Sequence, residues 1–180
     1  AIVSAASSES SVSCEVTFAK VGTEDLKSLE YPGIMPLSAH YTSDGTLIVV
    51  CDTAIMGFRD FELVWRHDFG GASPNVFCVN KDIVVSITAN NAIGSSNEAL
   101  IFDINGEILY NINLERKITD IATDGKTAVY AVGDGVGTRI DLNSGNLTEE
   151  EITVTPKKLL APEGSLIVCG ENGTDSHFCS

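Results

Sequence analysis

Residues 133–137 (GDGVG) form the richest glycine cluster in the 180-residue chain. Glycine-rich loops bind phosphate when their backbone N–H groups and the N-terminus of a following helix point at the anion. Here the next segment, residues 138–142 (TRIDL), has the composition of a strand, not of a helix start. The cluster therefore predicts a tight turn between two strands, in which glycine supplies the positive φ.

Residue types that bind metals are present but scattered. The three histidines share no HExxH motif and no i,i+2 pair, and they lie far apart in the chain: His40, His67 and His177. Aspartates recur at strand ends and in turns: Asp52, Asp103 and Asp141, and Asp44, Asp82 and Asp124. Calcium binding is one interpretation, but the EF-hand spacing is absent. An aspartate that accepts hydrogen bonds within its own turn accounts for the pattern, so no metal ligand is predicted.

Catalytic constellations are also absent from the pattern. No G-x-S-x-G elbow marks a serine nucleophile. The 25 acidic residues contain no pair that stands out as the two carboxylates of a glycosidase. We therefore predict no catalytic residue, no cofactor-binding residue and no cofactor.

One short stretch concentrates aromatic and cationic side chains in an otherwise acidic chain. Tryptophan and arginine are favoured in the energetic centres of protein interfaces. The predicted partner-binding patch consists of Phe58, Arg59, Phe61, Trp65 and Arg66. The competing interpretation is that Trp65, the only tryptophan, fills the gap between two neighbouring sheets.

The five cysteines form no CxxC pair: Cys14, Cys51, Cys78, Cys169 and Cys179. Three of them lie in apolar runs typical of strands, which predicts small buried side chains. A disulfide between Cys169 and Cys179 is the alternative, and the sequence leaves it open.

Charge and hydropathy exclude two classes of partner. The formal net charge is −14, and such a surface repels phosphate backbones, so nucleic acid is not expected. No run approaches the roughly 18 apolar residues of a membrane helix, so we expect no membrane contact by this segment. The N-terminus has no basic region and reads as the middle of a strand, and we expect further residues upstream in the natural protein.

These residues are carried by a repeat of about forty residues. Turn signals, each followed by an apolar run, recur at that spacing: Asp44-Gly45, Lys81-Asp82, Asp124-Gly125 and Glu163-Gly164. A second set of turns recurs at the same spacing: Val21-Gly22, Arg59-Asp60, Asn105-Gly106 and Ser144-Gly145. Strands are expected on both sides of each turn, as in the hairpin around Asn105-Gly106. The β-branched run 152–156 is also expected to be a strand.

The predicted fold is all-β, a partial β-propeller of four-stranded antiparallel blades, about four blades' worth and incomplete at both ends. A single domain, 1–180, is expected to contain blades at approximately 1–33 (incomplete), 34–71, 72–117, 118–156 and 157–180 (incomplete). No helix is expected between residues 80 and 155.

The chain resembles the broad WD40, YVTN and quinoprotein-like propeller group. The resemblance lies in the segments SDGTLIVVCD, TDGKTAVYAVGDG and PEGSLIVCGENG and in the hairpins ALIFDINGEILYNI and GTRIDLNSGNLTEEEI. The chain lacks the Gly-His and Trp-Asp dipeptides of WD40 repeats and the repeated tryptophan motif of quinoprotein enzymes. The resemblance implies architecture, including a likeness to the propellers of uncharacterised bacterial proteins that are often membrane-anchored, and it does not transfer a function.

The leading functional hypothesis is a non-catalytic module that binds or scaffolds a protein or peptide partner through loops of a propeller face. One alternative is a hydrolase or lyase with its site near the propeller axis. Another is a structural half-ring, in which a homodimer completes a ring of about eight blades. The compartment is left open, with the resemblance favouring the outside of the cytoplasm.

Overall fold

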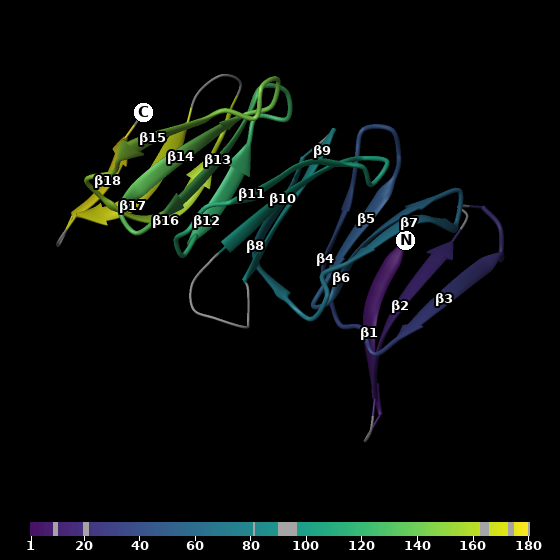
Figure 1. Ribbon diagram of the computed structural model, residues 1–180. Coiled ribbons are helices and arrows are strands. Elements are labelled where there is room, and N and C mark those ends of the chain that lie inside the picture. Colours follow the sequence, from purple (N-terminus) through teal and green to yellow (C-terminus); the bar gives the residue numbers. More distant parts are fainter. Residues whose placement is uncertain are drawn as a thin grey trace. The chain divides into compact units, whose positions relative to one another are not determined.

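The computed structural model describes residues 1–8, 11–19, 22–80, 82–89, 97–162, 166–172 and 175–179. Within these ranges every regular element is a β-strand of an antiparallel sheet, and no helix is found. No helix among the described residues is therefore long and apolar enough to cross a membrane. The all-β prediction is confirmed (Figure 1). By contact density the chain divides into two compact units.

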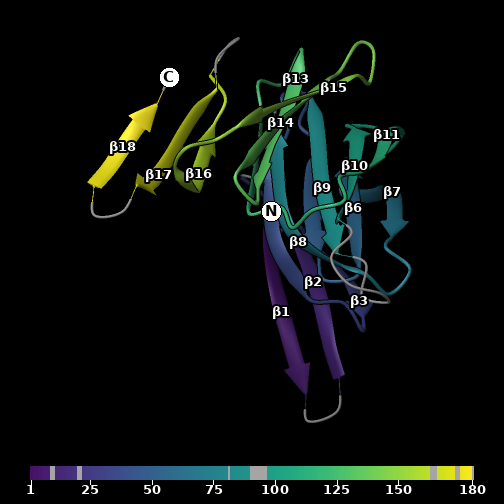
Figure 2. The ribbon, with the colours of Figure 1, turned by 60° about the vertical axis from the view of Figure 1, so that its left-hand side comes forward.

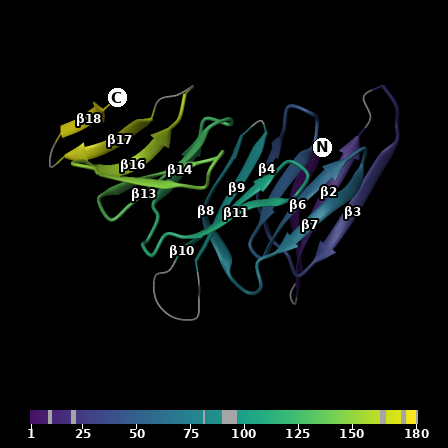
Figure 3. The same cartoon turned by 45° about the horizontal axis from the view of Figure 1, so that its top comes forward.

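The first unit comprises Ala1–Ser73 together with Ile104–Gly106. It contains a three-stranded and a four-stranded sheet, each with its strands in chain order. Figure 2 shows the long hairpin that begins the first sheet, and Figure 3 shows β6 beside β7 in the second. The strands of the first sheet are β1 (Ile2–Ser8), β2 (Ser11–Ala19) and β3 (Leu26–Pro32). Those of the second are β4 (Pro36–Tyr41), β5 (Leu47–Cys51), β6 (Ala54–Arg59) and β7 (Glu62–Asp68).

One apolar core joins the two sheets of the first unit. Its buried residues come from β2, β5, β6 and a connection: Cys14, Val16, Phe18, Ile34, Leu47, Val49, Cys51, Met56 and Phe58. Every residue of β5 is buried. The predicted burial of Cys51 is confirmed, and Cys14 is buried beside it, whereas Cys78 and Cys169 are only half-buried. A hydrogen bond with Cys14, added to burial, raises the pKa of the Cys51 thiol far above its usual value.

The second unit comprises Pro74–Asp103 and Glu107–Ser180 and contains three sheets. The first has β8 (Ser73–Asn80), β9 (Ile83–Ala89), β10 (Asn97–Asp103) and β11 (Ile108–Asn113). The second has β12 (Asp120–Thr123), β13 (Ala128–Gly133), β14 (Val136–Asp141) and β15 (Leu147–Glu151). The third, seen in Figure 2, has β16 (Thr155–Leu160), β17 (Ile167–Asn172) and β18 (Asp175–Cys179).

Two apolar cores join these three sheets face to face. Val129 and Ala131 of β13 point into the core shared with the β8–β11 sheet. Their neighbours Tyr130 and Val132 point into the core shared with the β16–β18 sheet. Because successive residues of a strand point to opposite faces, the all-apolar β13 is the sequence signature of a sheet covered on both sides. Each unit thus consists of small antiparallel sheets stacked on one another.

Asp44, Asp103, Asp124 and Asp141 accept hydrogen bonds within their own turns, as predicted, whereas Asp52 accepts one from the backbone N–H of Met35, 17 residues earlier. Asp44 accepts hydrogen bonds from the Thr42 hydroxyl (2.6 Å) and from the backbone N–H of Thr46 (3.1 Å). The Thr42 hydrogen bond is the main reason that the pKa of Asp44 is lowered to about 2. Desolvation alone would raise the pKa of Asp124, but hydrogen bonds from Thr127 and the surrounding backbone lower it to about 2. These perturbed carboxylates hold turns together.

The glycine cluster is also the predicted turn. β13 ends at Gly133 and β14 begins at Val136, and the two residues between them have φ values of 50° at Asp134 and 75° at Gly135. The expected strand over 152–156 is wrong for its first three residues. The N–H of Ile152 donates to the carbonyl of Gly135, Val154 is buried in the core, and pairing resumes only at β16. The chain passes between sheets here, and a connection that buries apolar residues looks like a strand in sequence.

Candidate protein-binding surface

The hairpin β6–β7 differs from the hairpins β2–β3, β10–β11 and β14–β15, which also join the last two strands of a sheet. Its turn residues Asp60 and Phe61 both have positive φ, at 51° and 66°. Such a turn suits the twist of a hairpin, and it usually takes glycine. The corresponding turns have Gly22, Gly106 and Gly145, with φ of 86°, 83° and 73°. Phe61 therefore occupies a glycine position.

Phe61 is held in this conformation by packing. Its ring centroid lies 5.3 Å from that of Phe18, at an interplanar angle of 52°. A bulky residue with positive φ costs on the order of 1–2 kcal/mol, and an aromatic pair returns about 0.5–1.5 kcal/mol. The two effects nearly cancel. Since 40% of Phe61 stays exposed, the ring also presents apolar surface to solvent.

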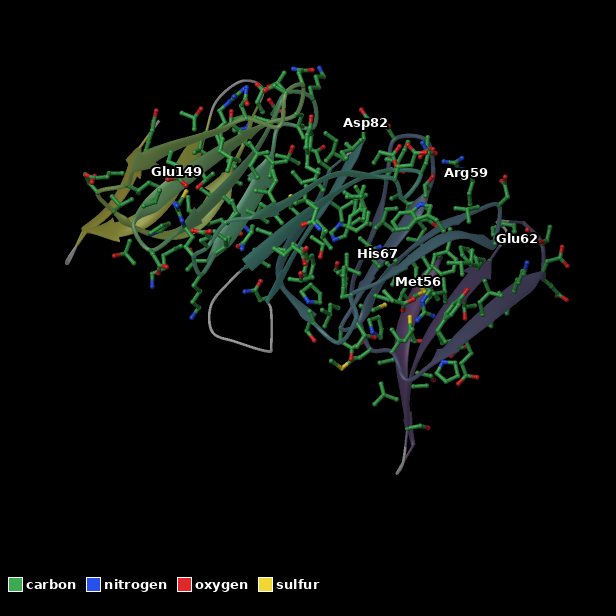
Figure 4. The ribbon with its side chains drawn as sticks, in the orientation of Figure 1. Met56, Arg59, Glu62, His67, Asp82 and Glu149 are labelled. Atoms are coloured by element: carbon green, nitrogen blue, oxygen red, sulfur yellow. The ribbon has the colours of Figure 1, made fainter. Side chains whose placement is uncertain are left out.

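Two members of the predicted patch are committed to other roles. Phe58 is only 1% exposed and lies in the core, so its ring does not reach the surface. The Arg59 guanidinium donates to Asp44 at 2.5 Å and to the Thr46 hydroxyl at 2.8 Å, which ties β6 to the preceding turn. Figure 4 labels Arg59 and Glu62, which pair across the β6–β7 turn.

Arg66 lies on the exposed side of β7. Its guanidinium contacts the Asp68 carboxylate, with Nε at 2.9 Å from Oδ1 and Nη2 also bonded to that oxygen. The hydrogen bond to Asp68 is the main reason that the pKa of Arg66 is raised. Its charge is thus balanced locally, and a partner meets an ion pair at this point.

Trp65 lies half-buried against backbone. Its Nε1 donates to the carbonyl oxygen of Ile104 at 2.9 Å. The indole covers two glycines: an added Cβ would lie 2.2 Å from Nε1 at Gly57 and 2.4 Å from Cδ2 at Gly106. The close packing of the indole over these two glycines agrees with the competing interpretation, in which Trp65 fills a gap between sheets. Its role in partner binding stays a prediction.

Two surface residues of this hairpin were missed by the sequence analysis. Leu63 is 37% exposed and Val64 is 51% exposed. The strand pairing shifts by one residue between Gly57 and Phe58, so Val64 falls in a β-bulge and has no partner in the β6–β7 register. A bulge redirects side chains and cannot be read from simple alternation. We call the exposed residues Phe61, Leu63, Val64 and Arg66 the β7 surface.

The other reactive side chains do not converge in the described part of the chain. No group of three or more His, Cys, Asp or Glu is placed to hold a metal ion among the described residues. His67 packs edge-on against Phe69, with ring centroids 5.8 Å apart, and the His177 side chain lies outside the described residues. Burial raises the pKa of the Cys78 thiol to about 12, which keeps it protonated. The proposed pairing of Cys169 involves the Cys179 side chain, which also lies outside the described residues.

Comparison with known proteins places the fold. No family model and no curated protein sequence matches the chain. Among solved structures, a chain of the Mitotic Checkpoint Complex matches with a TM-score of 0.59 at 12% identity, covering 93% of this chain and 53% of that one. Hsv2 of Kluyveromyces lactis matches with a TM-score of 0.53 at 11% identity, covering 76% and 42%. A protein of unknown function from Bacteroides caccae matches with a TM-score of 0.51 at 15% identity, covering 87% and 65%.

These neighbours include propeller-like proteins of the WD40 kind, and the likeness is one of fold. The all-β architecture of four-stranded antiparallel sheets is that of part of a β-propeller, as the sequence predicted. The chain spans about 42–65% of the length of these neighbours.

Proposed function

We propose that this chain belongs to a non-catalytic protein-binding module and that the β7 surface is where a partner protein docks. The partner is expected to present an apolar segment that covers Phe61, Leu63 and Val64. The Arg66–Asp68 ion pair lies beside this apolar surface, at the rim, where charged pairs contribute orientation more than affinity.

The observation that carries the proposal is Phe61 at a glycine position. A strained backbone conformation at an exposed aromatic residue is a feature that folding alone does not require, because glycine adopts it without strain. Such strain tends to accumulate at functional sites. An exposed aromatic ring flanked by exposed aliphatic side chains is also the composition of an interface centre.

The solved neighbours support a binding role in general terms. One of them is a chain of the Mitotic Checkpoint Complex. A sheet-stacked scaffold with short connections can carry such surfaces without change to its core.

The test uses a photo-crosslinking amino acid in place of Val64, with the chain produced in its natural host cells. We expect a covalent adduct with one defined protein. The matched control places the same amino acid at Leu109, an aliphatic residue on the outer strand β11 that is 43% exposed. A second control is Phe61→Gly in the Val64 crosslinking background, which should abolish the adduct while the circular dichroism spectrum is retained. Equal adducts from both positions, or an adduct that survives Phe61→Gly, would refute the proposal.

A further inference from the structure

Two thiols from different sheets meet in the core of the first unit. Cys14 lies on β2 of the three-stranded sheet, and Cys51 is the last residue of β5 in the four-stranded sheet. Both are free thiols with 0% exposure, and both belong to the apolar core that joins the two sheets, as does Met56, which Figure 4 labels. The two thiols are hydrogen-bonded to each other, so their sulfur atoms are in direct contact across the interface between the sheets.

The hydrogen bond makes the two thiols chemically unequal. It lowers the pKa of Cys14, against the opposing effect of burial, and it raises the pKa of Cys51. Cys14 is therefore the better nucleophile of the two, because the thiolate is the reactive form of cysteine. The positive charge of Arg66 acts to lower the pKa of Cys51, and it supports a thiolate there once the proton has left.

This arrangement is more than the filling of an apolar core requires. Valine occupies the neighbouring buried positions on the same two strands, Val16 and Val49, and it fills space without a polar hydrogen. A buried free cysteine packs as a small hydrophobe, and its reactivity usually decides its role. A disulfide needs two sulfurs that the fold has already brought together, and the contact between Cys14 and Cys51 meets this need.

We infer that Cys14 and Cys51 form a disulfide that ties β2 to β5 when the chain folds in an oxidising environment. The Cys14 thiolate attacks a disulfide oxidant of the glutathione class, which forms a mixed disulfide and releases one glutathione thiolate. The Cys51 thiol then loses its proton, and its thiolate attacks the Cys14 sulfur and displaces the second glutathione. The protein gives up two electrons and two protons, and the oxidant takes them up as two glutathione thiols.

Burial decides when this exchange takes place. Because neither sulfur is exposed, glutathione reaches the pair only before the core closes or while it opens. The disulfide then closes a loop that contains β3 and β4, one strand from each sheet. Such a cross-link restricts the unfolded chain and so stabilises the packed sheets. It lies inside the first unit and needs no partner at the β7 surface, so either proposal can fail alone.

The test maps the disulfides of the full 180-residue chain. The reduced chain is unfolded in urea and refolded in a buffer of reduced and oxidised glutathione, and the remaining free thiols are alkylated. Trypsin cuts after Lys20 and Lys27, so Cys14 and Cys51 fall in different peptides that mass spectrometry identifies as a linked pair. We expect this link in most molecules. The matched control Cys78→Ala changes a cysteine of the second unit and should keep the link, whereas Cys51→Ala should lose it.

Stability provides a second readout that needs no variant. The unfolding equilibrium constant of the oxidised chain in urea should be about a hundredfold smaller than that of the reduced chain. Three results would overturn the inference: absence of the link between Cys14 and Cys51 after refolding, a predominance of links to other cysteines, or an oxidised chain that is no more stable than the reduced one. The last result would show that the link strains the packed sheets instead of tying them together.

Discussion

Gly106→Ala should destabilise the first unit, and the size of the effect should depend on Trp65. The added Cβ would lie 2.4 Å from Cδ2 of the indole, and the backbone has a φ of +83°. Placing an alanine at positive φ costs about 1–2 kcal/mol. Moving the indole breaks its hydrogen bond to Ile104, worth about 1 kcal/mol, and strains its rotamer by about 0.5–1.5 kcal/mol. We therefore expect the free energy of unfolding to fall by about 3 kcal/mol.

A double-mutant cycle separates these contributions. In a Trp65→Ala background the clash and the hydrogen bond no longer exist, so Gly106→Ala should cost only the backbone term of about 1–2 kcal/mol. Gly22→Ala is the matched control: its φ is +86°, and no atom lies within 4 Å of the added Cβ. It should cost the same backbone term in either background.

The assay is urea unfolding followed by circular dichroism, with tryptophan emission as a second probe where Trp65 is present. Because Trp65 is the only tryptophan, a shift of its emission to longer wavelength in Gly106→Ala would report displacement of the indole directly. The reasoning would be refuted by an equal cost of Gly106→Ala in both backgrounds. A cost no larger than that of Gly22→Ala would refute it as well.

Three further outcomes are expected. The folded-state pKa of Asp124 is about 2, below its unfolded value of about 3.9, so its contribution to stability is present above the unfolded pKa and is lost as the pH falls toward 2. In acid titrations the wild type should therefore lose stability more steeply between about pH 5 and 2 than Asp124→Asn does. Parallel curves for the two proteins would contradict this. Cys14 and Cys51 are both 0% exposed, so iodoacetamide should modify them in the native chain only as fast as the core opens. Rapid labelling of the native chain, measured by mass spectrometry, would show that the core is not closed. Phe61→Gly should change the free energy of unfolding by less than about 1 kcal/mol, because relief of backbone strain offsets the loss of the Phe18 contact. A larger loss of stability in urea would show that Phe61 serves mainly as a core residue.

The fold was predictable because its signals are local. The Asp44 and Asp124 turns and the fully buried strand β13 leave marks of composition and spacing that need no knowledge of distant contacts. The run 152–156 was misread because a buried connection and a buried strand share the same β-branched composition. The backbone partner of a residue decides whether it belongs to a strand or to a connection. For Ile152 that partner is the carbonyl of Gly135, which lies elsewhere in the chain.

The candidate site was only partly predictable from composition. Composition located the aromatic and cationic cluster of β6–β7, but Phe58 lies in the core, and Val64 is exposed at a β-bulge of β7, where it has no partner in the register. A bulge changes the face of every following side chain, and no residue type announces it.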